Sequence, residues 1–60
     1  MKPITLTVRV APDTLVKIYD ETRDEVVFID NTNDDGETKP VTLKNNDGNY
    51  YIDLTMFQEN

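Results

Sequence analysis

The stretch NDDGETKPVTLKNNDG, residues 33–48, decides the fold of this chain. It carries the same turn signal twice, because NDDG at residues 33–36 returns twelve residues later as NNDG. Asp-Gly pairs supply the positive φ that tight turns require, and turn signals spaced by about 8–12 residues are typical of antiparallel all-β chains. The stretch therefore predicts strands before, between and after the two turns.

Apolar residues alternate with polar ones on both sides of these turns, which predicts strands that are buried on one face. The predicted strands are residues 4–10, 14–19, 26–29, 41–43 and 50–57. The block VVFI at residues 26–29 is apolar throughout, as in a strand covered on both faces, so we expect it at the centre of a sheet. The segment after Pro40 should be short, because proline suits the first residue or the edge of a strand.

No window of the chain places apolar residues at helical spacing, so we expect little or no helix. The predicted fold is one all-β domain over residues 1–60, a small antiparallel five-stranded sandwich or open barrel. The first and last strands should supply most of the core through their inner faces. These faces comprise Ile4, Leu6, Val8, Val10, Tyr50, Ile52, Leu54 and Met56.

Composition limits the chemistry of this 60-residue chain. It has no cysteine and no histidine, so we expect neither disulfides nor a zinc site, and no cofactor. Twelve acidic against six basic residues give a net charge of −6, which disfavours direct contact with nucleic acid or anionic membranes. We see neither a signal peptide nor a membrane span in the sequence and expect a cytoplasmic or virion-associated protein.

The polar run DNTNDDGETKP, residues 30–40, half-matches a calcium loop. Counted from Asn31, oxygen-bearing side chains and Gly36 fall at the required positions, but Thr42 stands where the closing carboxylate belongs. We interpret the run as a long connection turned by Gly36 and ended by Pro40. Weak calcium binding between Asn31 and Gly36 stays open.

The chain resembles the transthyretin-like, or carboxypeptidase-regulatory-like, β-sandwich domains, which are also called prealbumin-like. The matching segments are VKIYD at residues 16–20, TNDDG at residues 32–36, VTL at residues 41–43 and GNYYI at residues 48–52. The chain departs from that family in its shorter length and in Pro40, where the family has an aromatic or branched residue. Because members of this family are mostly non-catalytic adhesion, scaffold or accessory modules, the resemblance implies a binding or structural role.

Paired carboxylates occur in the predicted turns, where nothing would desolvate one member and raise its pKa, and the sequence has no nucleophile motif. We therefore expect no enzyme and no small-molecule substrate, and little room for a ligand-sized pocket. The acids could instead form a surface that imitates nucleic acid and inhibits a host nucleic-acid-handling enzyme, as in phage anti-defence proteins. This acidic surface comprises Asp20, Glu21, Asp24, Glu25, Asp30, Asp34, Asp35 and Glu37.

Three aromatic residues have no place on the predicted inner faces: Tyr19, Tyr51 and Phe57. Aromatic side chains are typical anchors of protein interfaces, and a strand at a sheet edge can pair with a partner. Our leading hypothesis is a non-enzymatic interaction or structural module of a phage or bacterial assembly, which binds a protein partner or self-associates. The acidic mimic is the alternative.

Overall fold

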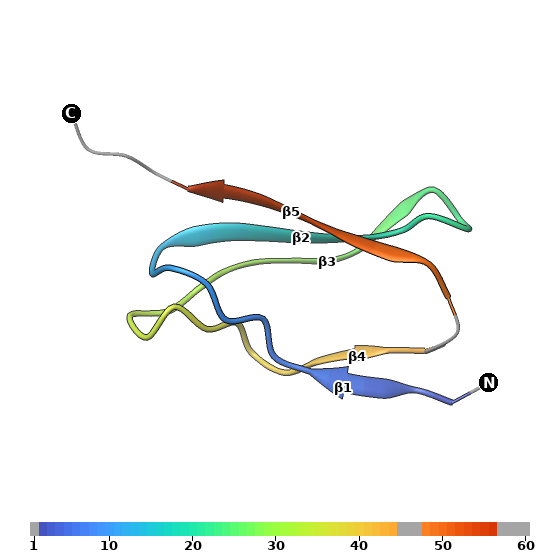
Figure 1. Ribbon diagram of the computed structural model, residues 1–60, viewed down its shortest axis with the longest axis horizontal. Helices are drawn as coiled ribbons and strands as arrows, with labels where there is room; N and C mark the ends of the chain where they lie inside the picture. Colours follow the sequence, from blue (N-terminus) through green and yellow to red (C-terminus); the bar gives the residue numbers. More distant parts are fainter. Residues whose placement is uncertain (1, 45–47, 57–60) are drawn as a thin grey trace.

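The computed structural model describes residues 2–44 and 48–56. Its strands are β1 (Ile4–Leu6), β2 (Thr14–Asp20), β3 (Glu25–Asn31), β4 (Val41–Leu43) and β5 (Tyr50–Met56). They form two antiparallel sheets, β1-β4 and β3-β2-β5 (Figure 1). The predicted all-β fold of five antiparallel strands is confirmed. Within the described part of the chain, no helix could span a membrane.

The central strand of the larger sheet is β2, which pairs with β3 on one side and β5 on the other. Its alternation places Val16 and Ile18 on the inner face, where both are fully buried, while Lys17 points to the outer face. The prediction that residues 26–29 form the central strand is wrong. They belong to β3, an edge strand whose Val26, Val27 and Ile29 are exposed, because an apolar run cannot by itself show which neighbours it will pair with.

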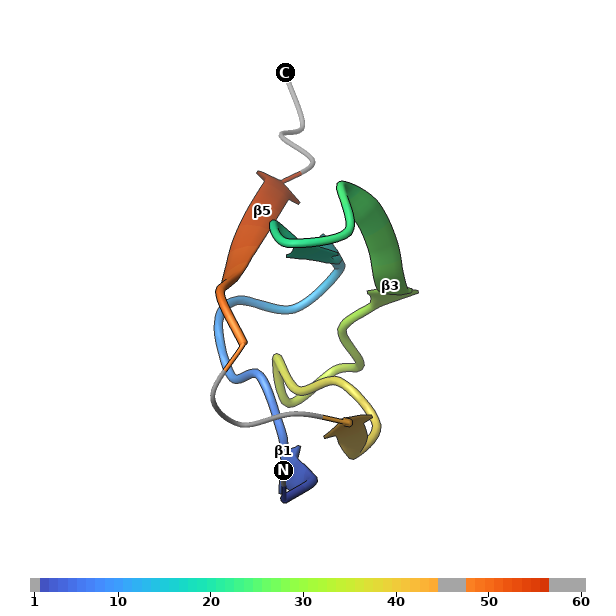
Figure 2. The same ribbon diagram turned by 90° about the vertical axis from the view of Figure 1, so that its right-hand side faces the viewer.

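The core lies between the two sheets, in the space that separates the layers in Figure 2. It consists of Val8, Val16, Ile18, Val41 and Leu43, with Leu6, Phe28 and Tyr50 packed around it. The prediction that the first and last strands supply most of it is wrong for Ile4, Val10, Ile52, Leu54 and Met56, which are exposed. A two-stranded sheet is too narrow to cover the whole inner face of three strands.

Strand β1 ends at Leu6, four residues earlier than predicted. Its register pairs Leu6 with Val41, so Thr7 would next face Pro40, which has no N–H to donate to the ladder. After Leu6, the chain forms hydrogen bonds with the β3–β4 connection instead. Thr38 N–H donates a hydrogen bond to Val8 C=O at 3.0 Å. The β strand thus continues only as an isolated bridge, Arg9 to Glu37.

Buried threonines fix the two long connections, residues 7–13 and 32–40, against the larger sheet. Thr32 Oγ1 accepts a hydrogen bond from Thr14 N–H at 2.8 Å and donates one to Ala11 C=O at 2.7 Å. Thr38 Oγ1 accepts from Val8 N–H at 3.1 Å. These hydroxyls satisfy backbone groups that no ladder reaches, so the connections act as structural parts of the fold.

Candidate protein-interaction surface

The outer face of the β3-β2-β5 sheet carries an aromatic pair. Tyr19 on β2 lies directly opposite Tyr51 on β5, and their rings stack with centroids 4.7 Å apart and planes 12° from parallel. Tyr51 is half exposed, so this tyrosine pair presents a flat aromatic surface to solvent. Both tyrosines that the sequence singled out are thus brought together, whereas Phe57, the third, lies outside the described residues.

The hydroxyl of Tyr51 stays protonated at neutral pH. Partial removal from water is the main cause that raises the pKa of Tyr51 above its usual value, followed by repulsion from Tyr19 and from the carboxylates of Asp24, Glu21 and Asp53. The tyrosine pair therefore offers a neutral phenol that can donate a hydrogen bond to a partner.

The inner face of β5 carries three aliphatic side chains that the core does not cover. They form the β5 apolar row: Ile52 is 48% exposed, Leu54 43% and Met56 56%. Each lies opposite an inner-face residue of β2, since Ile52 pairs with Ile18, Leu54 with Val16 and Met56 with Thr14. The row therefore extends the core face of the sheet beyond the area that the second layer covers.

β5 is also an edge strand, and it lacks the protection that the other edges have. It pairs with β2 along one side, and no other described residue pairs with its second side. Exposed edges are commonly protected from pairing by charges, prolines, bulges or short length. β1 and β4 are three residues long and follow prolines, and β3 carries a bulge opposite residues 18–19 and the charges Glu25 and Asp30.

Strand β5 has none of those devices apart from the single charge of Asp53. It is seven residues long, has no proline and pairs with β2 without a register shift. Apolar or aromatic side chains are exposed on both of its faces, Tyr51 on the outer face and the β5 apolar row on the inner face. A strand of this kind can accept an additional strand along its open edge.

The structure divides the predicted acidic surface between the two ends of the larger sheet. Asp20, Glu21, Asp24 and Glu25 gather at the β2–β3 turn and are called here the acidic turn. The other four lie near the far end of β3 or beyond it: Asp30, Asp34, Asp35 and Glu37. The separation is the length of seven-residue strands, about 20 Å, so the eight acids do not form one continuous surface.

Several of these carboxylates already have partners in the fold. Asp20 accepts hydrogen bonds from the backbone of Thr22 at 3.0 Å and Arg23 at 3.3 Å, and so holds the acidic turn in place. The Arg23 guanidinium reaches Asp20 at 4.0 Å and Glu25 at 3.7 Å. At the other end, Glu37 forms an ion pair with Arg9 at 2.8 Å and raises the pKa of that guanidinium through a hydrogen bond.

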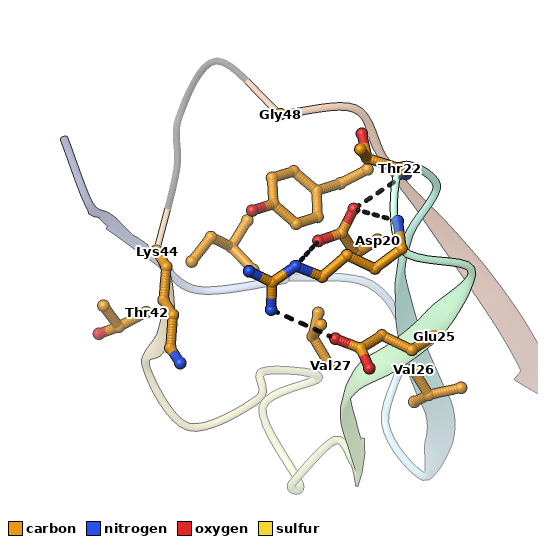
Figure 3. A pocket seen from close by; sticks show the side chains of 11 residues that line it. Asp20, Thr22, Glu25, Val26, Val27, Thr42, Lys44 and Gly48 are labelled. Atoms are coloured by element: carbon orange, nitrogen blue, oxygen red, sulfur yellow. Dashed lines mark hydrogen bonds and ion pairs between the residues drawn. The ribbon is translucent and has the colours of Figure 1, made fainter. Parts of the chain in front are cut away.

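An open pocket of about 640 Å³ lies beside the acidic turn, between that turn and β4. Figure 3 shows Asp20 and Glu25 on one side of it and Thr42 and Lys44 on the other. Its volume is in the range of small-molecule sites, which is larger than the sequence predicted. Four of its eleven lining residues are charged, Asp20, Arg23, Glu25 and Lys44, and Arg23 is already paired with both carboxylates.

The half-matched calcium loop is organised by Asn33 as a turn. The side-chain oxygen of Asn33 accepts hydrogen bonds from the N–H groups of Asp35 at 2.9 Å and Glu37 at 3.1 Å. Gly36 follows with φ of 80°, as a positive-φ turn residue. The second turn signal, residues 45–48, falls mostly outside the described residues. Among the residues that the structure does describe, no three His, Cys, Asp or Glu side chains are grouped as metal ligands.

Comparison of the chain with family models, with curated proteins and with solved structures finds no match.

Sequence reasoning singled out Tyr19 and Tyr51 individually but missed the β5 apolar row. Ile52, Leu54 and Met56 alternate as core residues do, and they do lie on the core face of their strand. Their exposure follows from the position of β5 at the sheet edge, which depends on pairing between distant segments. The absence of proline and lysine from β5 is the one signal in the sequence that could have indicated an open edge.

Proposed function

We propose that this chain is a non-enzymatic protein-interaction module that accepts an extended segment of a protein partner along the open edge of β5. The observation that carries this proposal is the β5 apolar row, half exposed on the core face of an edge strand that lacks protection. The resemblance to prealbumin-like domains supports the same class of role.

Strand addition would use both the unpaired backbone groups of β5 and the exposed side chains beside them. The added strand would bond to the outward N–H and C=O groups of β5, while its side chains would alternate between the two faces of the sheet. Those on one face would lie beside the β5 apolar row, and those on the other beside Tyr51. The contact would thus bury the flanks of side chains that the two-stranded sheet leaves uncovered.

Capture of partners from a lysate of the encoding organism tests this proposal when it is done with variants. Leu54→Lys places a charge in the β5 apolar row, whereas Thr42→Lys places the same charge on an exposed residue of β4. We expect the first to lose the bound protein and the second to keep it, with both variants folded by circular dichroism. Equal capture by the two variants would contradict a contact at β5.

The alternative function is an acidic inhibitor that mimics nucleic acid, and the gathering of four carboxylates in the acidic turn favours it. Exposed charges interact only over about 3–5 Å at high ionic strength, so such a complex should dissociate near 0.5 M salt. The same capture at low and high salt separates the two functions. Loss of the partner in high salt, together with retention by Leu54→Lys, would support the mimic.

A further inference from the structure

We infer that the strand received by β5 is the β5 strand of a second copy of this chain, paired antiparallel about a two-fold axis. This inference rests on the function proposed above and names the partner. The dimer would contain one continuous six-stranded sheet, β3-β2-β5 followed by its symmetry mate. Two-fold pairing requires that β5 be complementary to itself, and an axis at Leu54 meets this requirement best.

The single charged residue of β5 and the position of the β5 apolar row together favour this register. A two-fold axis at Asp53 would place two carboxylates directly opposite each other, which is destabilising. An axis at Leu54 instead opposes Leu54 with its own copy and Ile52 with Met56, so the β5 apolar row meets its equivalent along its whole length. Asp53 then faces Thr55, whose hydroxyl can donate a hydrogen bond to the carboxylate.

The distribution of charge favours the antiparallel arrangement. Asp20 of the acidic turn lies opposite Tyr50, four residues from the proposed axis at Leu54. Antiparallel strands would therefore hold the two acidic turns about 27 Å apart along the strand direction, well beyond the Debye length of about 8 Å at physiological salt. Parallel pairing would place both acidic turns at the same end of the sheet, where they would repel.

The small extent of the contact indicates a weak dimer. Standard interfaces bury about 800 Å² per partner. Five paired residues, 52 to 56, with one half-exposed row on each copy, belong to the small and transient class. We therefore expect a dissociation constant in the micromolar range. Because each copy carries a net charge of −6, screening should strengthen the dimer, so affinity should rise between low salt and about 0.5 M.

Sedimentation equilibrium over a range of protein concentrations tests the dimer. We expect the mass to rise from 6.9 kDa toward twice that value. A chain that stays monomeric at millimolar concentration in both low and high salt would overturn the second copy as occupant. Loss of capture by Leu54→Lys in the assay above would then still support the function proposed there, so the two failures are distinguishable.

Two lysine substitutions on neighbouring residues test the register. Leu54→Lys would oppose two ammonium groups at the axis, and we expect dimerisation at least about tenfold weaker. In Thr55→Lys, the new lysine of each copy would face Asp53 of the other copy. This gives two favourable charge pairs, and we expect roughly threefold tighter association. Thr42→Lys is the matched control, because it changes the net charge equally while lying on β4, away from the proposed contact.

Folding of each variant is checked by circular dichroism before its mass is measured. Should Leu54→Lys unfold, Thr55→Lys still tests the register on its own. The tighter dimerisation of Thr55→Lys should disappear when Asp53→Asn is added, because the carboxylate opposite the lysine is then gone. Equal dimerisation of Thr55→Lys and Thr42→Lys would overturn the proposed pairing, as would a gain that survives Asp53→Asn.

Discussion

At the scale of single residues, Gly36 has the most demanding position in the chain. Its φ is +80°, and a Cβ placed on it would lie 2.6 Å from the carbonyl oxygen of Val10. The same residue accepts a hydrogen bond from Val10 N–H at 2.8 Å, so the approach cannot relax without loss of that bond. The glycine is therefore needed to seat the β3–β4 connection on the segment before β2.

Gly36→Ala should consequently destabilise the fold by about 1–3 kcal/mol, through backbone strain and the displaced contact. Asp34→Ala in the same turn is the control. Its side chain is exposed, and a change within about 0.5 kcal/mol is expected there. Urea unfolding followed by circular dichroism measures both. Equal midpoints for the two variants would contradict the role assigned to Gly36.

Tyr51 should make stability depend on pH in alkaline solution. Its pKa is raised in the folded chain, chiefly by partial desolvation and then by nearby negative groups, so the unfolded chain loses the phenolic proton first. The contribution is fully present below about pH 10 and is lost as pH rises through the folded-state pKa. Tyr51→Phe should flatten the fall of unfolding free energy above that pH.

Absorbance of tyrosinate gives the direct measurement of that titration. The step that disappears in Tyr51→Phe should be the one that lies above the ordinary pKa of tyrosine, about 10. If the step removed by Tyr51→Phe lies at or below that value instead, the outer face does not stabilise the neutral form of the Tyr51 phenol.

At the scale of elements, β2 depends on a threonine contact at its first residue. Thr14 and Thr32 are both buried, and Thr32 Oγ1 accepts from Thr14 N–H at 2.8 Å while Thr32 N–H bonds to Thr14 C=O at 2.9 Å. Because β2 is the central strand, this contact ties the β3–β4 connection to the middle of the larger sheet.

Thr32→Val keeps the shape of the side chain but leaves Thr14 N–H and Ala11 C=O with fewer partners. We expect a loss of about 1–3 kcal/mol in unfolding free energy, the cost of an unsatisfied buried group. Thr42→Val makes the same change at an exposed site on β4, where its hydroxyl meets that of Thr5 at 3.0 Å, and should be near neutral. Thermal unfolding of the pair decides whether burial of the hydroxyl matters.

Strand positions could largely be predicted from the sequence, but strand pairing could not. Alternation located β2, β4 and β5 within one residue, because period-two patterns act locally. The ladder order depends on contacts between distant segments, so β3 was misplaced at the centre. Likewise, the pairing of Tyr19 with Tyr51 depends on the β2–β5 register. The sequence showed only that neither tyrosine belongs to a predicted inner face.

At the scale of the whole molecule, the small core and the exposed row have one cause. Among the residues that the structure describes, five buried aliphatic side chains form the core, since a two-stranded sheet faces a three-stranded one. A domain of this length buries only about 60% of its unfolded surface, which leaves little stability in reserve. Pairing the row of Ile52, Leu54 and Met56 side by side with that of a second copy would add apolar burial that the single chain lacks.

Residue-resolved amide hydrogen exchange at low and high protein concentration tests the β5 contact most directly. In dilute solution, we expect β2 amides to be protected and the β5 amides that point away from β2 to exchange quickly. At about 1 mM, those outward amides should become protected while the β3 edge stays unchanged. Protection of β5 that does not vary with concentration, or that grows at β3 instead, would contradict the account.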